Sequence, residues 1–386
     1  MVRSIEIQIE PSILKYARYL SGYSIEDASK KLKIEEERLR KLEEEKTSIT
    51  LGKIRKMSEV YKMPLVYFLL QKAPQDAMIP KDFRIVYASE TSEFSHEVMT
   101  AVRKARYAQS IVQDLQDGEI KYAFKSVGLG DDLEKAATDF LSLLSVSPAE
   151  KKKWSTPALT LRGWKDAVER LGIFVLQQSL QKDDVSAFCL ADEKPYIIML
   201  NSAEHENRRI FSLFHEIGHI LLHQSGVCTP DNFSRNSYEY TKVEKFCNQF
   251  AASVLVPVSG FKSNDIVMRM SKIPFENWLA EDIKSLARVY QVSQEVIYRR
   301  LVQIGVLSEK KYEQRRNELM KSFEEYKKRT KKNVVVPQYR KIISKNGRAF
   351  TSLVLRSMNE SRITLTDVSS FLGTTSKHIS AIETNV

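Results

Sequence analysis

The residues most able to do chemistry in this 386-residue chain form a His-Glu-x-x-His sequence, His215 to His219. On an α-helix, residues four positions apart share a face, with Cβ atoms about 5–6 Å apart, so both histidines can reach one metal ion. Glu216 then stands beside the open position of that metal, where a carboxylate can accept a proton from water. The flanking residues are apolar almost all round, which predicts a buried helix whose polar side chains need a partner. The pattern is typical of zinc-dependent hydrolysis.

A catalytic zinc ion usually has three protein ligands, so a third must come from elsewhere in the chain. His223 is the nearest candidate, but it lies eight residues after His215, about 12 Å along a helix axis. That distance is too long for the two side chains to share one ion, and His223 is more simply structural. A carboxylate on the following helix is the remaining source.

That following helix is predicted at residues 241–255. Thr241 and Glu244 have the spacing of a capping box at its start, and Pro257 forbids its continuation. Glu244 therefore has two readings, as a cap or as the third metal ligand, and the incomplete zinc site favours the second. Asn248 lies one turn later and is a candidate for orienting the ligands.

These two segments together resemble the ImmA/IrrE family of metallo-endopeptidases, including the members with an N-terminal Xre-type helix-turn-helix domain. The matching residues are Ile210-Phe-Ser-Leu-Phe-His-Glu-Ile-Gly-His-Ile-Leu-Leu-His223 and Glu244-x-x-x-Asn248-x-Phe250-Ala251-x-x-x-Leu255-x-Pro257. The resemblance implies that Zn²⁺ is bound by His215, His219 and Glu244. It also implies that Glu216 is the catalytic base and that the substrate is a partner repressor or an antitoxin-like protein.

The elements that must position this site give an α+β fold class. A helix is predicted at 161–171, followed by strands at 173–177, 185–190 and 196–201. Helix, small sheet and His-Glu-x-x-His helix follow one another in the order of a zincin-like core, which we place at 151–260. A helical linker region, 76–150, precedes it. A substrate can add to the edge of such a sheet as an extended strand, which requires an unfolded or loop segment. Three residues are candidates for stabilising the oxyanion, and nothing selects among them: Tyr238, Tyr240 and His205.

Residues 1–75 are predicted to form a five-helix, Xre-like helix-turn-helix domain, with helices at 11–21, 24–32, 35–45, 51–61 and 64–70. Two features depart from that pattern. Lys33 occupies the turn where glycine is usual, and the expected recognition helix carries six carboxylates that would repel DNA phosphates. These are Glu35, Glu36, Glu37, Glu43, Glu44 and Glu45. A protein-docking or dimerising role is therefore favoured, while duplex DNA and a homodimer remain open.

The C-terminal part of the chain is helical and basic. Residues 261–310 are predicted to contain a helix-turn-helix-like pair, and 311–386 a basic helical region. Residues 301–386 hold 17 Lys and Arg against eight Asp and Glu, which is +9 of the whole chain's +11. Such a stretch is either a nucleic-acid footprint or a solvated surface. The expected nucleic-acid contacts are Lys327, Lys328, Arg329, Lys331 and Lys332.

Composition favours a cytoplasmic protein with no membrane partner, since no run of eighteen apolar residues and no signal peptide is present. The three cysteines lack metal-binding spacing and are expected to be free thiols. The leading hypothesis is a zinc-dependent endopeptidase that cleaves a regulatory protein, although manganese or iron could replace zinc. The alternative is a DNA-binding transcriptional regulator or antitoxin whose peptidase-like domain is not catalytic.

Overall fold

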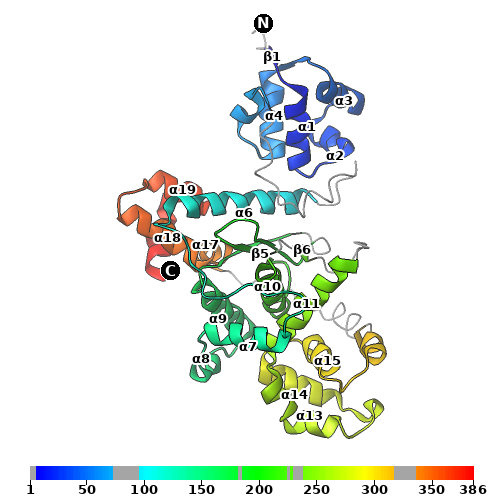
Figure 1. The fold of residues 1–386 in the computed structure, drawn as a ribbon. Helices are drawn as coiled ribbons and strands as arrows, with labels where there is room; N and C mark the ends of the chain where they lie inside the picture. Colours follow the sequence, from blue (N-terminus) through cyan, green and yellow to red (C-terminus); the bar gives the residue numbers. More distant parts are fainter. Residues whose placement is uncertain (1–5, 73–94, 181–184, 224–226, 229–237, 317–335) are drawn as a thin grey trace. The chain divides into compact units, whose positions relative to one another are not determined.

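The computed structural model describes residues 6–72, 95–180, 185–223, 227–228, 238–316 and 336–386. The chain divides into two compact units (Figure 1). The first contains residues 1–107 and 179–185, and the second contains residues 108–178 and 186–386. Helices dominate and the strands form two small sheets, so the predicted α+β class is confirmed.

The first unit is a cluster of short helices with a two-stranded antiparallel sheet. Four α-helices follow the predicted segments closely: α1 (Pro11–Leu20), α2 (Ile25–Leu32), α3 (Glu36–Glu44) and α4 (Leu51–Tyr61). The fifth predicted helix is instead a 3₁₀ helix, η1 (Leu65–Leu69), because five residues between an extended Pro64 and an extended Leu70 leave no room for a longer α-helix. Strands β1 (Glu6–Gln8) and β2 (Ser48–Thr50) pair with each other.

The turn between α2 and α3 has a left-handed residue at position 33, where glycine is usual. The Ser24 side chain caps α2 by accepting a hydrogen bond from the Asp27 amide. Lys33 ends α2 in the left-handed region, with φ at 57°. One part of the charge argument is wrong, because Glu43 does not lie on the surface of α3. It is buried, and its two carboxylate oxygens accept hydrogen bonds of 2.8 Å from Arg18.

The second unit begins within α6 (His96–Leu115) and continues through α7 (Leu133–Leu143), α8 (Pro148–Lys152) and α9 (Pro157–Glu169). Helix α9 starts four residues earlier than predicted. Pro157 is its first residue, where proline needs no amide partner, and Thr156 caps it.

A four-stranded sheet lies at the centre of this unit, in the order β3-β5-β4-β6. Its strands are β3 (Phe174–Gln178), β4 (Ala187–Leu190), β5 (Ile197–Asn201) and β6 (Val227–Cys228). Strands β3 and β5 are parallel, and β4 is antiparallel to both of its neighbours. All residues of β4 and β5 are buried, which explains their continuous apolar sequence.

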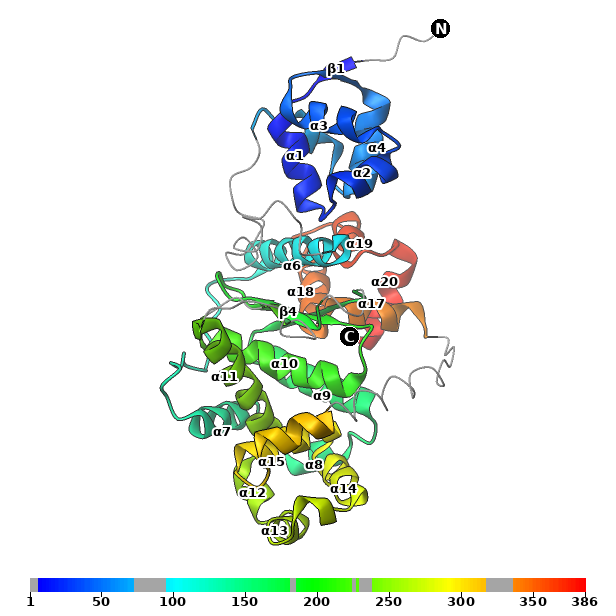
Figure 2. The ribbon, with the colours of Figure 1, turned by 90° about the vertical axis from the view of Figure 1, so that its right-hand side faces the viewer.

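Helix α10 (Glu206–Leu221) packs against β4, β5, α9 and α11 (Tyr238–Leu255). Helix α11 begins three residues before the predicted start, so Thr241 lies inside the helix and is not its cap. The chain continues through α12 (Val258–Lys262), α13 (Asp265–Met270), η3 (Phe275–Asn277), α14 (Ala280–Tyr290) and α15 (Gln294–Gln303). Figure 2 shows these helices gathered next to α11. The turn between α14 and α15 has Gln291 in the left-handed region and Ser293 as the cap.

The C-terminal helices are α17 (Gln338–Asn346), α18 (Arg348–Asn359), α19 (Leu365–Leu372), η4 (Ser376–His378) and α20 (Ile379–Asn385). Helix α17 packs against the edge strand β3. Helix α19 ends at Gly373, which lies in the left-handed region. The expected nucleic-acid contacts Lys327, Lys328, Arg329, Lys331 and Lys332 lie outside the described residues. No helix in the described part of the chain is long and apolar enough to cross a membrane.

Candidate metal centre

Helices α10 and α11 bring three polar side chains together in the interior of the second unit. The Nε2 atoms of His215 and His219 lie 3.2 Å apart. The Glu244 carboxylate faces both rings, with its oxygens 3.4 Å from the His215 Nε2 and 3.3 Å from the His219 Nε2. All three side chains are buried. The structure therefore places the Glu244 carboxylate next to the histidine pair. Of the two readings of Glu244, a helix cap does not apply, because α11 begins before Thr241.

The spacing of these atoms suits a metal ion. Zinc bonds of about 2.0–2.2 Å at tetrahedral angles put neighbouring ligand atoms about 3.3–3.6 Å apart, close to the separations observed here. Two imidazoles and one carboxylate are also a common donor set for catalytic zinc. The alternative to a metal site is a pair of structural core histidines that are held by hydrogen bonds. The Nδ1 atoms of both rings have no hydrogen-bond partner among the described residues, so the contacts of this group run through the Nε2 atoms, which face the carboxylate.

The electrostatics of the group favour a cation between the rings and the carboxylate. Burial acts to raise the pKa of Glu244, but hydrogen bonds from His215 and His219 outweigh it and hold that pKa well below its usual range. Burial acts to lower the pKa of His219, but Cys247 and Glu244 raise it well above its usual range. These two shifts favour an ionised Glu244 carboxylate beside a protonated His219 ring. A metal ion would replace that proton.

Glu216 follows the first histidine on α10 and is fully buried. Burial raises the pKa of its carboxyl, and the charges of His219 and His215 oppose that shift. A carboxyl with a raised pKa holds a proton more readily near neutral pH, which is the property that a general base and acid needs.

A cleft of about 1050 Å³ reaches the metal-binding group from the surface of the second unit. His215, Glu244 and Asn248 line its inner part, whereas Glu216 and His219 do not belong to its lining. Most of the other lining residues come from the start of α9, the start of α10, helices α14 and α15, and residues 309–316. This volume and its mixed apolar and charged walls are typical of a ligand-binding cleft.

Several other candidates lie away from this group. His205 caps α10, ten residues and about 15 Å along the axis from His215, although it lines the outer cleft. His223 is exposed and contacts the Tyr196 hydroxyl. The side chains of Tyr238 and Tyr240 are outside the described residues.

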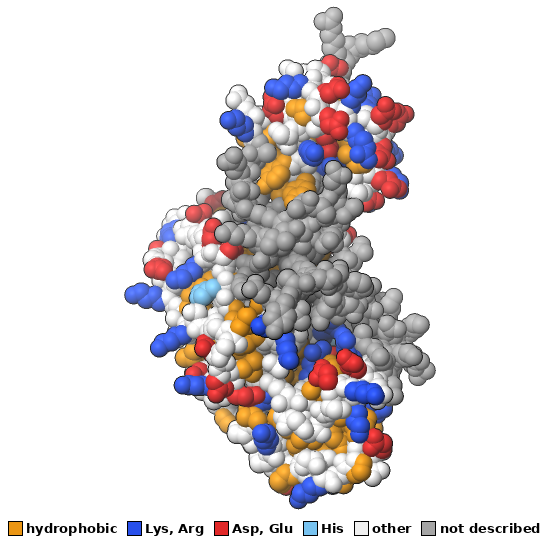
Figure 3. Space-filling model, turned by 45° about the vertical axis from the view of Figure 1, so that its right-hand side comes forward, with side chains coloured by type: hydrophobic (Ala, Val, Ile, Leu, Met, Phe, Trp, Pro, Cys, Tyr) orange, Lys and Arg blue, Asp and Glu red, His pale blue; other side chains and the backbone are white. Residues whose placement is uncertain are grey.

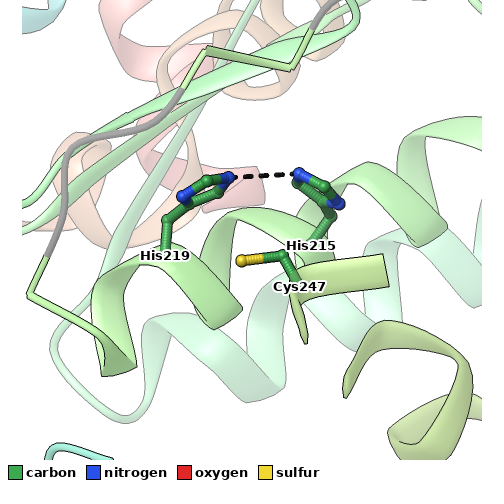
Figure 4. Close-up of side chains that lie close together, drawn as sticks. All are labelled: His215, His219 and Cys247. Atoms are coloured by element: carbon green, nitrogen blue, oxygen red, sulfur yellow. Dashed lines mark hydrogen bonds between the residues drawn. The ribbon is translucent and has the colours of Figure 1, made fainter. Parts of the chain in front are cut away.

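Cys247 is the residue that sequence reasoning missed. Its sulfur and the ring nitrogens of His215 and His219 all lie within 4.8 Å of one another (Figure 4). Its position three residues after Glu244, and so on the same face of α11, was the signal that could have found it.

Comparison with known protein families agrees with this geometry. Residues 168–302 match the peptidase M78 family, described as an IrrE N-terminal-like domain. Residues 14–68 match a helix-turn-helix family. No curated protein gives a significant match to the chain. The chain thus combines a metallopeptidase-type domain of the IrrE N-terminal-like family with an N-terminal Xre-type helix-turn-helix domain, and the resemblance in its motifs is confirmed.

Proposed function

We propose that this protein is a cytoplasmic zinc-dependent endopeptidase that cleaves a partner regulatory protein, either a repressor or an antitoxin-like protein. The observation that carries the proposal is the convergence of His215, His219 and Glu244 at the inner end of a cleft, with Glu216 next to the first histidine. The family match supports a hydrolase of the metallopeptidase type. We also propose that residues 151–260 form a zincin-like core.

In this mechanism His215, His219 and Glu244 would hold the zinc ion, which would polarise a water molecule and a peptide carbonyl when bound. Glu216 takes a proton from the attacking water and returns it to the amine that leaves. The buried surroundings raise the pKa of Glu216 and so favour its holding the proton between the two transfers. Asn248, one turn after Glu244, orients the ligand carboxylate from the wall of the cleft. The substrate enters as an extended segment, because a folded surface does not fit a cleft of this size.

Metal analysis tests the binding part of the proposal. We expect about one zinc ion per chain in the purified protein, and loss of zinc from both the His219→Ala and Glu244→Ala variants. Retention of zinc by Glu244→Ala would assign the third ligand elsewhere. Failure of the wild-type protein to bind zinc, manganese or iron would contradict the enzyme hypothesis.

Proteolysis is tested in cells, because the substrate is defined only as a class. New protein N-termini are compared by mass spectrometry in cells that express the wild-type protein, Glu216→Gln or His219→Ala. We expect at least one cleaved regulatory protein in the wild-type sample alone. Loss of the general base should lower the cleavage rate about 10²–10⁴-fold while zinc binding is retained. Equal cleavage by wild type and Glu216→Gln would refute the role of Glu216.

A second activity, duplex DNA binding by the first unit, has support from two observations. The helix-turn-helix match covers α1 to α4, and α3 exposes the cationic side chains Arg38, Arg40 and Lys41. The burial of Glu43 also removes one carboxylate from the DNA-facing charge. The test is salt-dependent binding of a random duplex library by the full chain, with Arg38→Glu/Lys41→Glu as the variant. Binding that is equal in both proteins would exclude α3 as the contact helix.

A further inference from the structure

The thiol of Cys247 lies beside the metal-binding group but has no role in the mechanism above. The side chain is fully buried, and its sulfur lies within 4.8 Å of a ring nitrogen of both His215 and His219. Figure 4 shows the sulfur pointing from α11 toward the His219 side of the pair. Cys247 therefore belongs to a buried cluster of possible metal ligands, with two histidines and the Glu244 carboxylate next to them.

The contact between α10 and α11 accounts for the position of the thiol. Gly218 lies between the two histidines on α10, and a Cβ atom at that position would be 3.0 Å from the Cys247 Cα and 3.1 Å from its sulfur. The absence of a side chain at Gly218 lets α11 approach closely enough to present Cys247 to the site. On α11, Cys247 is also one turn from Glu244, so both side chains face α10.

We propose that Cys247 is a fourth protein ligand to the metal, in addition to His215, His219 and Glu244. This inference rests on the proposed zinc site. Thiolate is a preferred zinc ligand, with a bond of about 2.3 Å, and a ligand sulfur lies about 3.5 Å from neighbouring nitrogens in a tetrahedral site. The sulfur and a ring nitrogen of each histidine lie within 4.8 Å of one another, so the thiol stands next to the position that the metal would take.

Charge balance supports the same assignment. A zinc ion held by two neutral histidines and one glutamate leaves one positive charge in a buried site, which is costly unless an anion neutralises it. A hydroxide or a thiolate can supply that anion. The thiol is already part of the interior, whereas the cleft reaches His215 and Glu244 without reaching Glu216 or His219.

The consequence concerns regulation of the peptidase. Structural zinc sites have four protein ligands, while catalytic sites keep one position open for water. With Cys247 bound, the site is closed and Glu216 has no metal-activated water to deprotonate. Exchange of the thiolate for water would open it: the metal–sulfur bond breaks, the thiolate takes a proton from the incoming water, and a hydroxide is left at the open position. The chain thus carries a resting state that is defined by one sulfur–metal bond.

The experiment replaces zinc with cobalt(II) in the full-length protein and records the absorption spectrum. A cobalt–thiolate bond gives a charge-transfer band in the near ultraviolet, and the visible ligand-field bands report tetrahedral binding with any donor set. We expect both kinds of band in the wild-type protein. Cys247→Ser and Cys247→Ala should lose the charge-transfer band but keep the visible bands, which also shows that the site remains folded. The matched control is Cys189→Ser, which removes the buried thiol of β4 and should keep both.

The outcomes separate this inference from the proposed function. Visible bands without a charge-transfer band in the wild type would overturn the thiolate ligand and leave the zinc site in place. A charge-transfer band that persists in both Cys247 variants would overturn it as well. Absence of cobalt binding by the wild type, with the same result for His219→Ala, would instead remove the metal site on which both proposals depend.

Discussion

Asn248 is a single residue whose position at the metal centre can be tested directly. It is half-buried on α11, one turn after Glu244, and lines the same cleft as His215. Groups that orient metal ligands typically contribute a factor of about 10–100 to metal affinity or activity. We expect Asn248→Ala to weaken zinc binding within that range, measured by competition with a chromogenic chelator. Lys245→Ala changes an exposed residue of the same helix and should bind zinc as the wild type does. Equal affinity of the two variants would leave Asn248 as a lining residue only.

Glu244 could be predicted from the sequence as a residue of the site, whereas Cys247 could not. His215 and His219 could be predicted because helical periodicity places them on one face, and Glu216 because it belongs to the same motif. Glu244 was found by asking which carboxylate on the next helix could complete the set. Cys247 shares a face of α11 with Glu244, but that spacing alone does not show that the face meets the two histidines. Its proximity depends on the close approach of two helices at Gly218, which is a tertiary contact.

At the scale of elements, the contact between α10 and α11 determines whether the site forms. Gly218→Ala would place a Cβ atom 3.0 Å from the backbone of Cys247, and backbone atoms cannot move aside easily. We expect a loss of about 1–3 kcal/mol in the free energy of unfolding, measured with urea, together with weaker zinc binding. Gly260→Ala is the control, since nothing lies within 4 Å of a Cβ atom there. If Gly218→Ala and Gly260→Ala are equally stable, the contact between α10 and α11 accommodates the added methyl group, and the close approach at Gly218 is not required.

The turn between α2 and α3 carries a second element-scale prediction. Lys33 has φ at 57°, a conformation that costs a residue with a Cβ atom about 1–2 kcal/mol. Lys33→Gly is therefore expected to stabilise the first unit by about 1 kcal/mol, while Lys33→Ala should give no such gain. Hydrogen exchange of peptides from α1 to α4 measures the effect, and a gain of this size slows exchange by about fivefold. Exchange that is no slower in Lys33→Gly than in Lys33→Ala would show that the turn carries no such strain.

The helix boundaries show which part of the fold was accessible from sequence. Helices α2 and α4 were predicted within a residue, at 24–32 and 51–61, and α2 has a clear cap in Ser24. The starts of α9 and α11 were placed too late. Pro157 is the first residue of α9, where proline is well suited, although the helix was predicted to begin at residue 161. Thr241 has the spacing of a cap, although α11 begins three residues before it. Capping residues and prolines indicate where a helix can begin or end, but whether it does so depends on its packing in the folded protein.

At the scale of the whole molecule, the basic C-terminal region is only partly free to bind an anionic partner. The dense cluster Lys327 to Lys332 is outside the described residues, and its role in nucleic-acid binding stays a prediction. Among the described residues, Arg348 lies 3.7 Å from Asp166 and Arg362 lies 3.2 Å from Asp117. Figure 3 shows basic and acidic side chains interspersed on the described part of one face. The first pair is half-buried and the second is largely exposed; such pairs contribute little to stability, but they reduce the net positive field of the C-terminal helices.

Glu169 joins those C-terminal helices to the central sheet. It is buried at the end of α9, and its Oε2 accepts hydrogen bonds of 3.1 Å from the amides of Arg348 and Ala349 at the start of α18. Its Oε1 accepts a bond of 3.3 Å from the Val175 amide on β3. Gly347 has φ at +77°, and a Cβ atom there would lie 2.4 Å from Oε1. The Glu169 carboxyl thus links the edge strand β3 to the first turn of α18.

This arrangement predicts how stability depends on pH. Burial raises the pKa of Glu169 from an ordinary 4.5 to about 7, against the opposing effects of the Lys165 ammonium and the amide donors. Because the folded-state pKa is the higher one, the folded protein holds this proton more tightly than the unfolded chain does. The stabilisation is complete below about pH 4.5 and is lost as pH rises to about 7, for a total of about 3 kcal/mol.

Urea unfolding of the wild type and Glu169→Gln measures this effect, followed by tryptophan fluorescence, since Trp154, Trp164 and Trp278 all lie in the second unit. The free energy of unfolding of the wild type, relative to Glu169→Gln, should fall by about 2–3 kcal/mol between pH 5 and pH 8. Glutamine cannot ionise, so other titrating groups contribute equally to both curves. Parallel curves would mean that the amide donors and Lys165 outweigh the burial of the carboxylate. Glu169 would then be ionised in the folded protein throughout this range, and the C-terminal helices would be attached by a charge rather than by a neutral acid.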